Sequence, residues 1–134
     1  MNIKELIPQR EPILMVDRVA SHSNEKTETT FLKIKTNIFV EDGCFRSSGI
    51  IENIAQSAAV RMGMKTIKEN TKPALGYIAA IKNLEIFCFP NVGETLSTEI
   101  VVTNQINNIL VVNAICRIDN KIVANCELKV FIEI

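Results

Sequence analysis

The sequence predicts an α+β fold in which one long helix packs against an antiparallel sheet. Residues 49–70 carry the one long helical pattern. From residue 74 onward the chain consists of strand-like runs separated by turn-forming residues. Such a chain buries both kinds of element only if the sheet curls around the helix or stacks on it as one layer. At 134 residues, we expect a single domain covering residues 1–134.

The first half of the chain is predicted to hold one short helix, two strands and the long helix. In order, these elements are expected at residues 3–7, 13–21, 26–36 and 49–70. Pro8 ends the first helix, because proline lacks the backbone N–H that a helix interior needs. Ser48 is placed to cap the long helix, since a serine hydroxyl accepts from the free N–H groups at a helix start.

Four strands are predicted in the second half, because turn-forming residues separate four apolar runs. They are expected at residues 74–89, 94–105, 109–118 and 121–134. In the last run every second residue from Ile122 to Ile134 is apolar, and several residues between them are charged or polar. This period of two predicts a strand with one buried face.

Composition and charge argue against several classes of function. Fifteen basic and fifteen acidic residues cancel, and only 5% of the residues are aromatic, which argues against nucleic acid or an anionic membrane as partner. No apolar run approaches the roughly 20 residues that span a bilayer, and no signal-like segment opens the chain, so we expect a cytoplasmic protein. Four cysteines without a C-x-x-C pair, and one histidine, predict free thiols and no metal site.

One carboxylate lies in the middle of the long helix. At about 100° per residue, Asn53, Ser57 and Arg61 form the only strongly polar side of this helix. Glu52 projects to the opposite side, among small apolar residues, and that side is expected to pack on the sheet. A buried carboxylate is rare unless it is paired or used in chemistry. Both interpretations stay open, with Gln56, backbone donors or Arg18 as partners in the structural one.

The start of the helix carries a second chemical feature. The backbone N–H of Gly49 lies at the positive end of the helix dipole, where it can polarise a carbonyl oxygen. Because glycine has no side chain, a substrate can approach it closely. Further along, Ala55, Ala59 and Gly63 leave room for packing or for an extended ligand beside the helix.

Three segments resemble motifs of the bacterial 3-hydroxyacyl-[acyl-carrier-protein] dehydratases. They are "IPQREPILMVDRV" at residues 7–19, "GCFRSSGIIENIAQSAA" at 43–59 and "LGYIAAIKNLEIFCFPNVGETL" at 75–96. The first resembles the opening signature of the family, the second its Gly-His-Phe segment and its helix with Glu-x-x-Ala-Gln, and the third its later strand and turn. The resemblance implies the hotdog fold, in which a curled antiparallel sheet wraps around one long central helix. It also implies a homodimer or larger oligomer with active sites between protomers.

The resemblance also assigns residues. Glu52 matches the catalytic acid of the family, Gly49 the glycine whose N–H holds the thioester carbonyl, and Gln56 the glutamine after the acid. Phe45 follows in the Gly-His-Phe-like segment and is expected to bind substrate together with Gly49 and Gln56. Cys44 occupies the position of the catalytic histidine, and the loop between it and the helix is several residues shorter than in the family. Cys44 is therefore either an altered catalytic residue or a small buried one.

Three functions follow from these features. The first is a lyase that removes water from a 3-hydroxyacyl thioester in fatty-acid or polyketide-type synthesis, with an altered active site. The second is a thioesterase, in which Glu52 activates water or attacks the thioester and no histidine is needed. The third is a non-catalytic subunit that binds acyl carrier protein or pairs with a complete hotdog protein.

In each case the acyl group arrives on an acyl carrier protein or on coenzyme A. That carrier brings its own phosphopantetheine, so we expect no further cofactor. His22 lies in the polar link between two predicted strands and is expected to be exposed and without a catalytic role.

Overall fold

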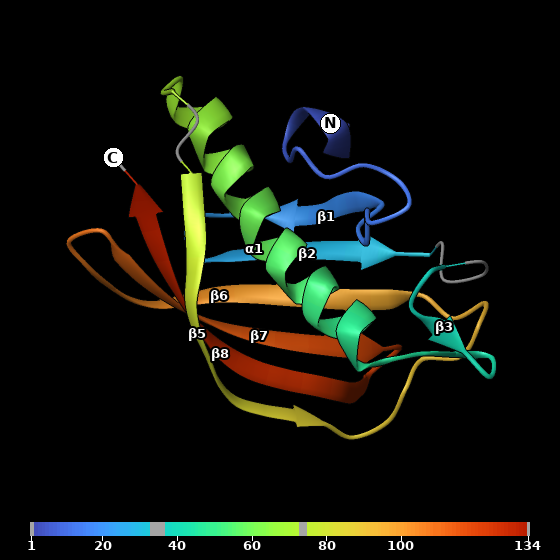
Figure 1. Cartoon of the computed structure of the whole chain (residues 1–134). Coiled ribbons are helices and arrows are strands. Elements are labelled where there is room, and N and C mark those ends of the chain that lie inside the picture. The colour runs from blue at the N-terminus through green and yellow to red at the C-terminus, as the bar shows by residue number, and fades with distance from the viewer. Residues whose placement is uncertain (1, 33–36, 73–74, 134) are drawn as a thin grey trace.

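One long helix, α1 (Ser47–Glu69), crosses one face of a six-stranded antiparallel sheet in the computed structural model, which describes residues 2–32, 37–72 and 75–133 (Figure 1). In spatial order the strands are β1 (Arg18–His22), β2 (Lys26–Phe31), β6 (Leu96–Ile106), β7 (Ile109–Ile118), β8 (Lys121–Glu133) and β5 (Leu75–Ile86). Outside this sheet lie the 3-10 helix η1 (Ile3–Glu5) and a two-stranded sheet of β3 (Val40–Glu41) and β4 (Cys44–Phe45). The predicted α+β class, with one long helix on an antiparallel sheet, is confirmed.

The long helix begins two residues before its predicted start. Its N-cap is Arg46, whose side chain makes no capping hydrogen bond, so the prediction of Ser48 as the N-cap is wrong. Ser48 lies in the first turn of the helix instead. At the other end Asn70 takes a left-handed conformation with φ 53°, and its N–H donates to the carbonyls of Ile67 and Thr66. This left-handed residue ends the helix.

The strand predictions are most accurate in the second half of the chain. β7 matches its predicted range, and β8 buries alternate residues as predicted: Ala124, Cys126, Leu128 and Val130. Ile122 is 40% exposed, and the pairing of β7 with β8 shifts register between this residue and Ala124. The first two strands are shorter than predicted. Residues 33–36, 74 and 134, which the predictions also covered, lie outside the described residues.

A polar row of α1 faces the sheet. Three pairs join the helix to β2 and β6: Asn53 with Thr98 at 2.6 Å, Ser57 with Thr29 at 2.8 Å, and Arg61 with Thr27 at 3.0 Å. These side chains are all buried. The prediction that the opposite side of the helix packs on the sheet is therefore wrong, because the threonine hydroxyls of β2 and β6 satisfy the polar side.

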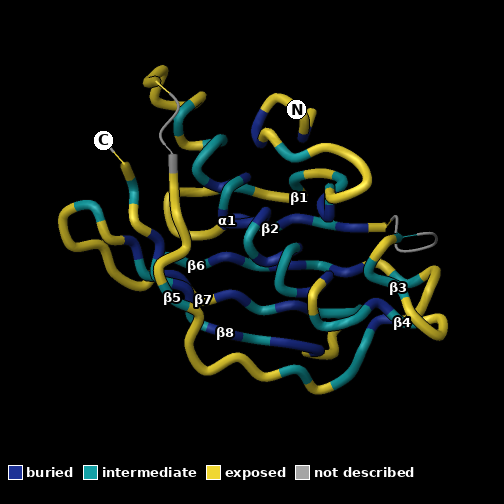
Figure 2. The backbone as a smooth tube through the Cα atoms, viewed as in Figure 1, coloured by how far each residue is buried: buried dark blue, intermediate teal, exposed yellow. Residues whose placement is uncertain are grey.

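The apolar core fills the rest of the space between α1 and the sheet. Ile50 and Ile54 point into it, and the rings of Phe31 and Phe45 meet there with centroids 5.7 Å apart. Burial is concentrated in the central strands, whereas β5 is exposed along most of its length (Figure 2). The edge of the sheet formed by β5 is therefore the part of the fold with least cover.

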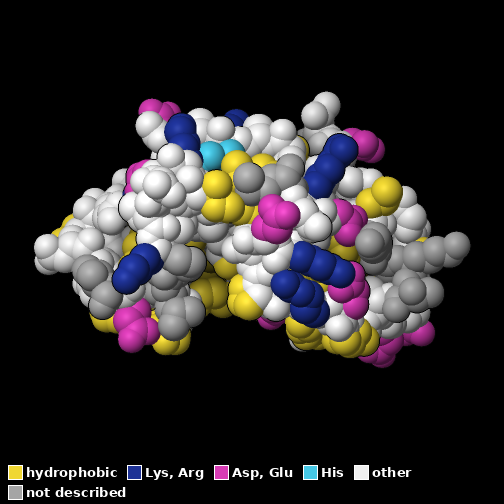
Figure 3. Space-filling view, turned by 90° about the horizontal axis from the view of Figure 1, so that it is seen from above, with side chains coloured by type: hydrophobic (Ala, Val, Ile, Leu, Met, Phe, Trp, Pro, Cys, Tyr) yellow, Lys and Arg dark blue, Asp and Glu magenta, His cyan; other side chains and the backbone are white. Residues whose placement is uncertain are grey.

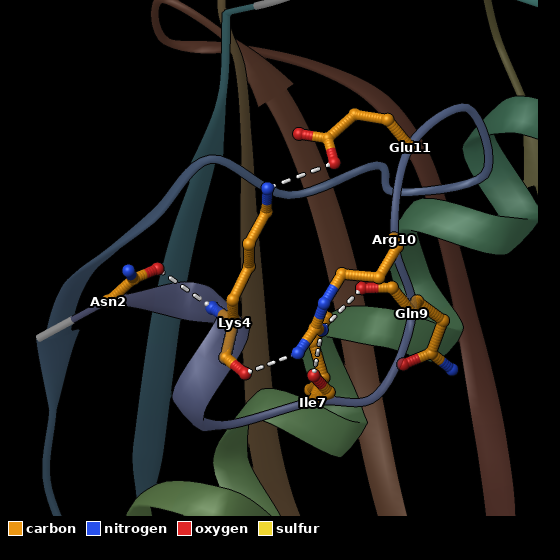
Figure 4. A network of polar contacts seen from close by, with 6 residues as sticks. All are labelled: Asn2, Lys4, Ile7, Gln9, Arg10 and Glu11. Carbon is orange, nitrogen blue, oxygen red and sulfur yellow. Dashed lines mark hydrogen bonds and ion pairs between the residues drawn. The ribbon is translucent and has the colours of Figure 1, made fainter.

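The N-terminal segment is held together by the side chain of Arg10 (Figure 4). Its guanidinium donates to the carbonyls of Ile7 at 2.8 Å, Gln9 at 2.9 Å and Lys4 at 3.0 Å. Lys4 also forms an ion pair with Glu11 at 3.2 Å. These contacts fold residues 4–11 back on themselves and fix the chain that leads to the first strand.

Candidate active site

The helix carboxylate of Glu52 is oriented by the side chain one turn after it. Nε2 of Gln56 donates to Oε1 of Glu52 at 2.9 Å. The second carboxylate oxygen, Oε2, makes no hydrogen bond with the described residues. Glu52 is half-buried rather than fully buried. It therefore presents one held oxygen and one available oxygen at the surface of the helix.

The orientation of the Gln56 amide follows from the N-terminal segment. Its Oε1 accepts from the backbone N–H of Met15 at 2.7 Å, and its Nε2 donates to the carbonyl of Ile13 at 2.8 Å. Because the Met15 N–H can only donate, the amide oxygen must face it and the NH₂ group must face Glu52. All these contacts lie within the chain, and Gln56 is fully buried. In this structure Gln56 thus positions Glu52 and has no free group for the substrate contact that was expected of it.

Gly49 is required by packing. A Cβ atom at this position would lie 2.4 Å from Cε1 of Phe45 and 2.8 Å from Cβ of Phe39. The space that was expected to admit a substrate is therefore filled by two phenylalanine side chains of the same chain. The Gly49 N–H also donates to the carbonyl of Arg46 at 3.0 Å, so it is not free to hold a thioester oxygen in this structure.

The free N–H groups at the start of α1 belong to the two preceding residues. Ser47 and Ser48 are the first helical residues, and no hydrogen bond from the described chain occupies their N–H groups. Such groups, at the positive end of a helix dipole, bind oxygen atoms with partial negative charge. The N–H groups that are free to polarise a carbonyl oxygen are therefore those of the two residues before Gly49.

Cys44 and Phe45 lie in β4, before the helix. Sγ of Cys44 is 3.5 Å from Oδ1 of Asn91, an acceptor that binds the thiol proton. Arg46 does not contact this sulfur: its side chain donates to the Glu41 carbonyl and lies over the ring of Phe89. Phe45 is fully buried in the core, so the structure shows it supporting the helix start and not contacting a ligand. No hydrogen bond joins Cys44 to Glu52 within the described chain.

His22, the only histidine of the chain, lies beside the C-terminal half of α1 and not beside Glu52. His22 ends β1, and its Nδ1 is 2.7 Å from Oγ1 of Thr27. It is half-buried rather than exposed as expected. Burial, followed by the charges of Arg61 and Lys68, lowers the pKa of His22. These two cations lie nine and sixteen residues after Glu52 on α1, so His22 does not supply a base to the Glu52 site within this chain.

All four cysteines are free thiols, as predicted. Burial raises the pKa of Cys116 to about 12 and that of Cys126 to about 11. Among the described residues, no three His, Cys, Asp or Glu side chains come close enough to share a metal ion. None of the described helices has the combination of length and apolar character that crossing a membrane requires.

A narrow cavity continues the helix face that carries Glu52. It has a volume of about 200 Å³ and lies beside Ala59, Met62 and Gly63 of α1. Residues 52, 56, 59 and 63 follow one another at helical spacing and therefore share this face. Gln9 of the N-terminal segment also lines the cavity, and its Oε1 is buried without a hydrogen-bond partner in the described residues. The small residues therefore leave room beside the helix, as the sequence suggested.

A long helix that crosses one face of a curled antiparallel sheet defines a protein of the hotdog class. The chain belongs to the ApeP-like family: the family model described as ApeP dehydratase matches residues 1–133.

Relatives with curated names support the same class. The chain is 31% identical to the 3-hydroxyacyl-[acyl-carrier-protein] dehydratase FabZ of Vibrio atlanticus, over 95% of this chain and 88% of that protein. It is 29% identical to the FabZ of Bacillus velezensis, over 94% of this chain and 92% of that protein. The resemblance to this family is thus confirmed over nearly the whole length of the chain.

Solved structures share the fold at low sequence identity. A chain of the dehydratase heterocomplex ApeI:P from Xenorhabdus doucetiae superposes with a TM-score of 0.89 at 14% identity, covering 100% of this chain and 92% of that one. The PaaI protein of E. coli superposes with a TM-score of 0.69 at 13% identity, covering 84% of this chain and 80% of that one. These likenesses confirm the hotdog fold.

Proposed function

We propose that this chain is a dehydratase subunit that acts on 3-hydroxyacyl thioesters, and that a second hotdog protein completes its active site. Glu52 supplies the acid, and a histidine of the partner supplies the base. The observation that carries this proposal is the pair formed by Glu52 and Gln56, which leaves Oε2 available in a chain whose only histidine lies elsewhere. The names of the FabZ relatives support the substrate class.

The chemistry needs two groups that exchange one proton. The base removes a proton from the carbon next to the thioester carbonyl, and protonated Glu52 gives its proton to the 3-hydroxyl group. The C–H and C–O bonds break, a carbon–carbon double bond forms, and water leaves. The proton on the base then returns to Glu52, which restores both groups. A positioned base contributes about 10²- to 10⁴-fold to such a step, so its absence from this chain points to a partner.

Negative charge builds on the thioester oxygen during proton removal. We assign its stabilisation to the unpaired N–H groups of Ser47 and Ser48 at the start of α1. Gly49 then acts through packing: its lack of a side chain lets Phe45 and Phe39 support this turn of the helix. Cys44 is a structural residue in this scheme, because its thiol is bonded to Asn91.

The substrate and its carrier follow from the same scheme. An acyl chain attached near Glu52 would extend along the cavity beside Ala59, Met62 and Gly63. The acyl group would be carried by an acyl carrier protein or by coenzyme A. Its phosphopantetheine arm is then the only cofactor that the scheme includes. The free thiols fit a reducing compartment such as the cytoplasm.

The exposed β5 edge is the surface that we assign to the partner. Ile78 and Ile81 pair with Val130 and Leu128 of β8, so their side chains lie on the core-facing side of the sheet. Val130 and Leu128 are buried, whereas Ile78 and Ile81 are each 40% exposed. The core layer is therefore left open at this edge. A long apolar edge strand of this kind is a template for pairing with another sheet.

A mass-spectrometric time course tests the proposal. The purified chain is incubated with a 3-hydroxyacyl thioester, alone and after co-expression with an ApeI-type hotdog protein, and loss of water and release of free thiol are followed together. We expect water loss that is much faster with the partner. Thiol release without water loss would assign the chain to the thioesterases, and full water loss by the chain alone would remove the need for a partner.

A further inference from the structure

A small cavity lies at the C-terminal half of α1, separate from the candidate active site. It has a volume of about 200 Å³ and is bounded by the β1–β2 turn on one side and the helix on the other. Its lining residues are His22, Asn24, Arg61, Lys65, Lys68 and Glu69. Arg61 follows Glu52 by nine residues. At about 1.5 Å per residue, Arg61 lies about 14 Å from Glu52 along the helix axis.

The guanidinium of Arg61 is buried without a carboxylate partner. Arg61 is 6% exposed, and its N–H groups donate to the carbonyls of Ser23 and Asn24 and to Oγ1 of Thr27. No carboxylate of the described residues forms an ion pair with it. Two carbonyl oxygens and one hydroxyl oxygen satisfy three of the five N–H donors but leave the positive charge uncompensated. A buried charge of this kind is costly unless an opposite charge binds beside it.

The other cavity residues add further positive charge. Lys65 and Lys68 line the cavity with Arg61, and Glu69 is the one carboxylate among the lining residues. The net charge of the lining is therefore +2 when His22 is neutral. The attraction of basic residues to a helix C-terminus explains Lys68 alone, because it falls off within the last turn. Arg61 and Lys65 lie before that turn.

His22 reports the same electrostatic environment. Its ring is desolvated and lies within the fields of Arg61 and Lys68, which lower its pKa. Arg61 and His22 both contact the hydroxyl of Thr27, at 3.0 Å and 2.7 Å. The histidine side chain, in cyan, reaches the surface on the face seen from above (Figure 3). Because His22 also lines the cavity, a ligand inside it meets the imidazole as well as the cations.

We propose that this cavity is a binding site for a phosphate group, which Arg61, Lys65 and Lys68 hold by charge-assisted hydrogen bonds. Arg61 has two N–H donors left, and a guanidinium can bind two oxygens of one phosphate through two of its donors. A doubly negative phosphate also matches the net charge of the lining. The group is either free inorganic phosphate or the phosphate of a larger molecule. The proposal does not depend on the role of Glu52.

The single histidine makes a direct test possible. The ring of His22 is titrated by NMR in sodium chloride and in sodium sulfate at equal ionic strength, sulfate being a phosphate mimic whose charge is constant from pH 5 to 9. Because an anion in the cavity offsets the fields of Arg61 and Lys68, the midpoint of the His22 titration should be higher in sulfate and should saturate with its concentration. Equal midpoints in the two salts would overturn the proposal.

Variants separate this site from general ion effects. Lys65→Met with Lys68→Met removes two exposed cations and should abolish the sulfate-dependent shift, whereas the matched control Lys121→Met, at an exposed position outside the cavity, should keep it. Both variants retain Arg61 and its contacts to the β1–β2 turn, so we expect them to fold like the wild type. A double variant that keeps the full shift would contradict the assignment.

Calorimetry identifies the source of the phosphate. Inorganic phosphate, coenzyme A and dephospho-coenzyme A are titrated into the wild-type protein, the last two differing only in the 3′-phosphate. Tighter binding of coenzyme A than of dephospho-coenzyme A, lost in the double lysine variant, would indicate an esterified phosphate. Binding of inorganic phosphate alone would indicate the free ion. If none of the three binds to the folded protein, the cavity is not a phosphate site.

Discussion

Nε2 of Gln56 lies 2.9 Å from Oε1 of Glu52, and the same amide is fixed by the backbone of the N-terminal segment. The position of the helix carboxylate is therefore linked to residues about 40 positions earlier in the chain. Ile13 and Met15 supply the carbonyl and the N–H that lock the amide. This linkage gives the opening segment of the chain a part in the site, although none of its described side chains forms a hydrogen bond with Glu52.

Gln56→Met should lower both stability and activity. Methionine fills a similar volume but leaves the buried Met15 N–H and the part-buried Ile13 carbonyl without this partner, and loss of the partner of the buried N–H costs about 1–3 kcal/mol. Urea unfolding measures this loss. Because Glu52 also loses its orienting contact, the rate of water loss should fall at saturating substrate with KM little changed. An unchanged rate in folded protein would show that the contact does not position Glu52.

Glu52→Gln should abolish water loss while the fold is kept. The amide has nearly the same shape as the carboxyl group but cannot give a proton to the leaving hydroxyl, and loss of such a group costs about 10²- to 10⁴-fold in rate. Circular dichroism and the thermal midpoint check the fold. Glu41→Gln, at an exposed carboxylate of β3, is the matched control and should leave the rate unchanged.

Gly49→Ala should destabilise the protein by about 1–3 kcal/mol, the usual cost of overpacking a core. The new Cβ would lie 2.4 Å from a ring atom of Phe45, and the buried ring has no free space to move into. Phe45→Leu removes the ring atoms concerned. In a double-mutant cycle, Gly49→Ala should therefore lower the free energy of unfolding less in the Phe45→Leu background than in the wild type. If Gly49→Ala is as stable as the wild type, packing does not explain the glycine.

The buried thiol of Cys116 should make stability depend on alkaline pH. Burial raises its pKa from 9.0 to about 12, so between these values the unfolded chain loses this proton while the folded chain keeps it. The free energy of unfolding should therefore be fully retained below pH 9 and should fall by roughly 1–2 kcal/mol as the pH rises to about 10.5. Urea midpoints measure the fall. In Cys116→Ala the free energy of unfolding should depend less on pH. It should also be lower than in the wild type by a constant amount at neutral pH, because the substitution creates a cavity.

Ile81→Lys should weaken association of the chain with its partner or with a second copy. Ile81 is 40% exposed at the β5 edge, so a lysine there disturbs the interface more than the monomer. Sedimentation equilibrium should show a larger monomer fraction than for the wild type. Ile106→Lys is the control, because Ile106 is more solvent-accessible than Ile81, at 61%, but lies on β6, an interior strand of the sheet. Equal monomer fractions in the two variants would place the interface elsewhere.

Much of the fold could be predicted from the alternation of apolar and polar residues and from turn-forming residues. Which side of the helix packs on the sheet could not be predicted in this way. The period of two in β8 predicts its buried face correctly, because hydrophobic burial dominates there. In α1 the polar residues Asn53, Ser57 and Arg61 are predicted to be exposed as long as the sequence of the helix is considered alone. Alternate threonines in residues 26–31 were the available signal: a strand that buries hydroxyl groups needs polar partners from the element above it.

Within the candidate site, the contact between Glu52 and Gln56 could be predicted from the sequence, but the anchoring of Gln56 could not. Glu52 and Gln56 are adjacent on the helix, so their contact follows from i to i+4 spacing. The free N–H groups were placed on Gly49 because the helix was expected to start two residues later than it does. The anchoring of Gln56 by Ile13 and Met15 joins positions far apart in the sequence, and no local pattern indicates it.

The most direct test of the central claim is single-turnover water loss from a 3-hydroxyacyl thioester by the complex of this chain with an ApeI-type partner. The wild-type complex is compared with one in which only this chain carries Glu52→Gln. If this chain supplies the acid, the rate should fall by two to four orders of magnitude, although the partner is unchanged. An undiminished rate in the variant complex would show that the chemistry resides wholly in the partner, and Glu52 would have no part in it.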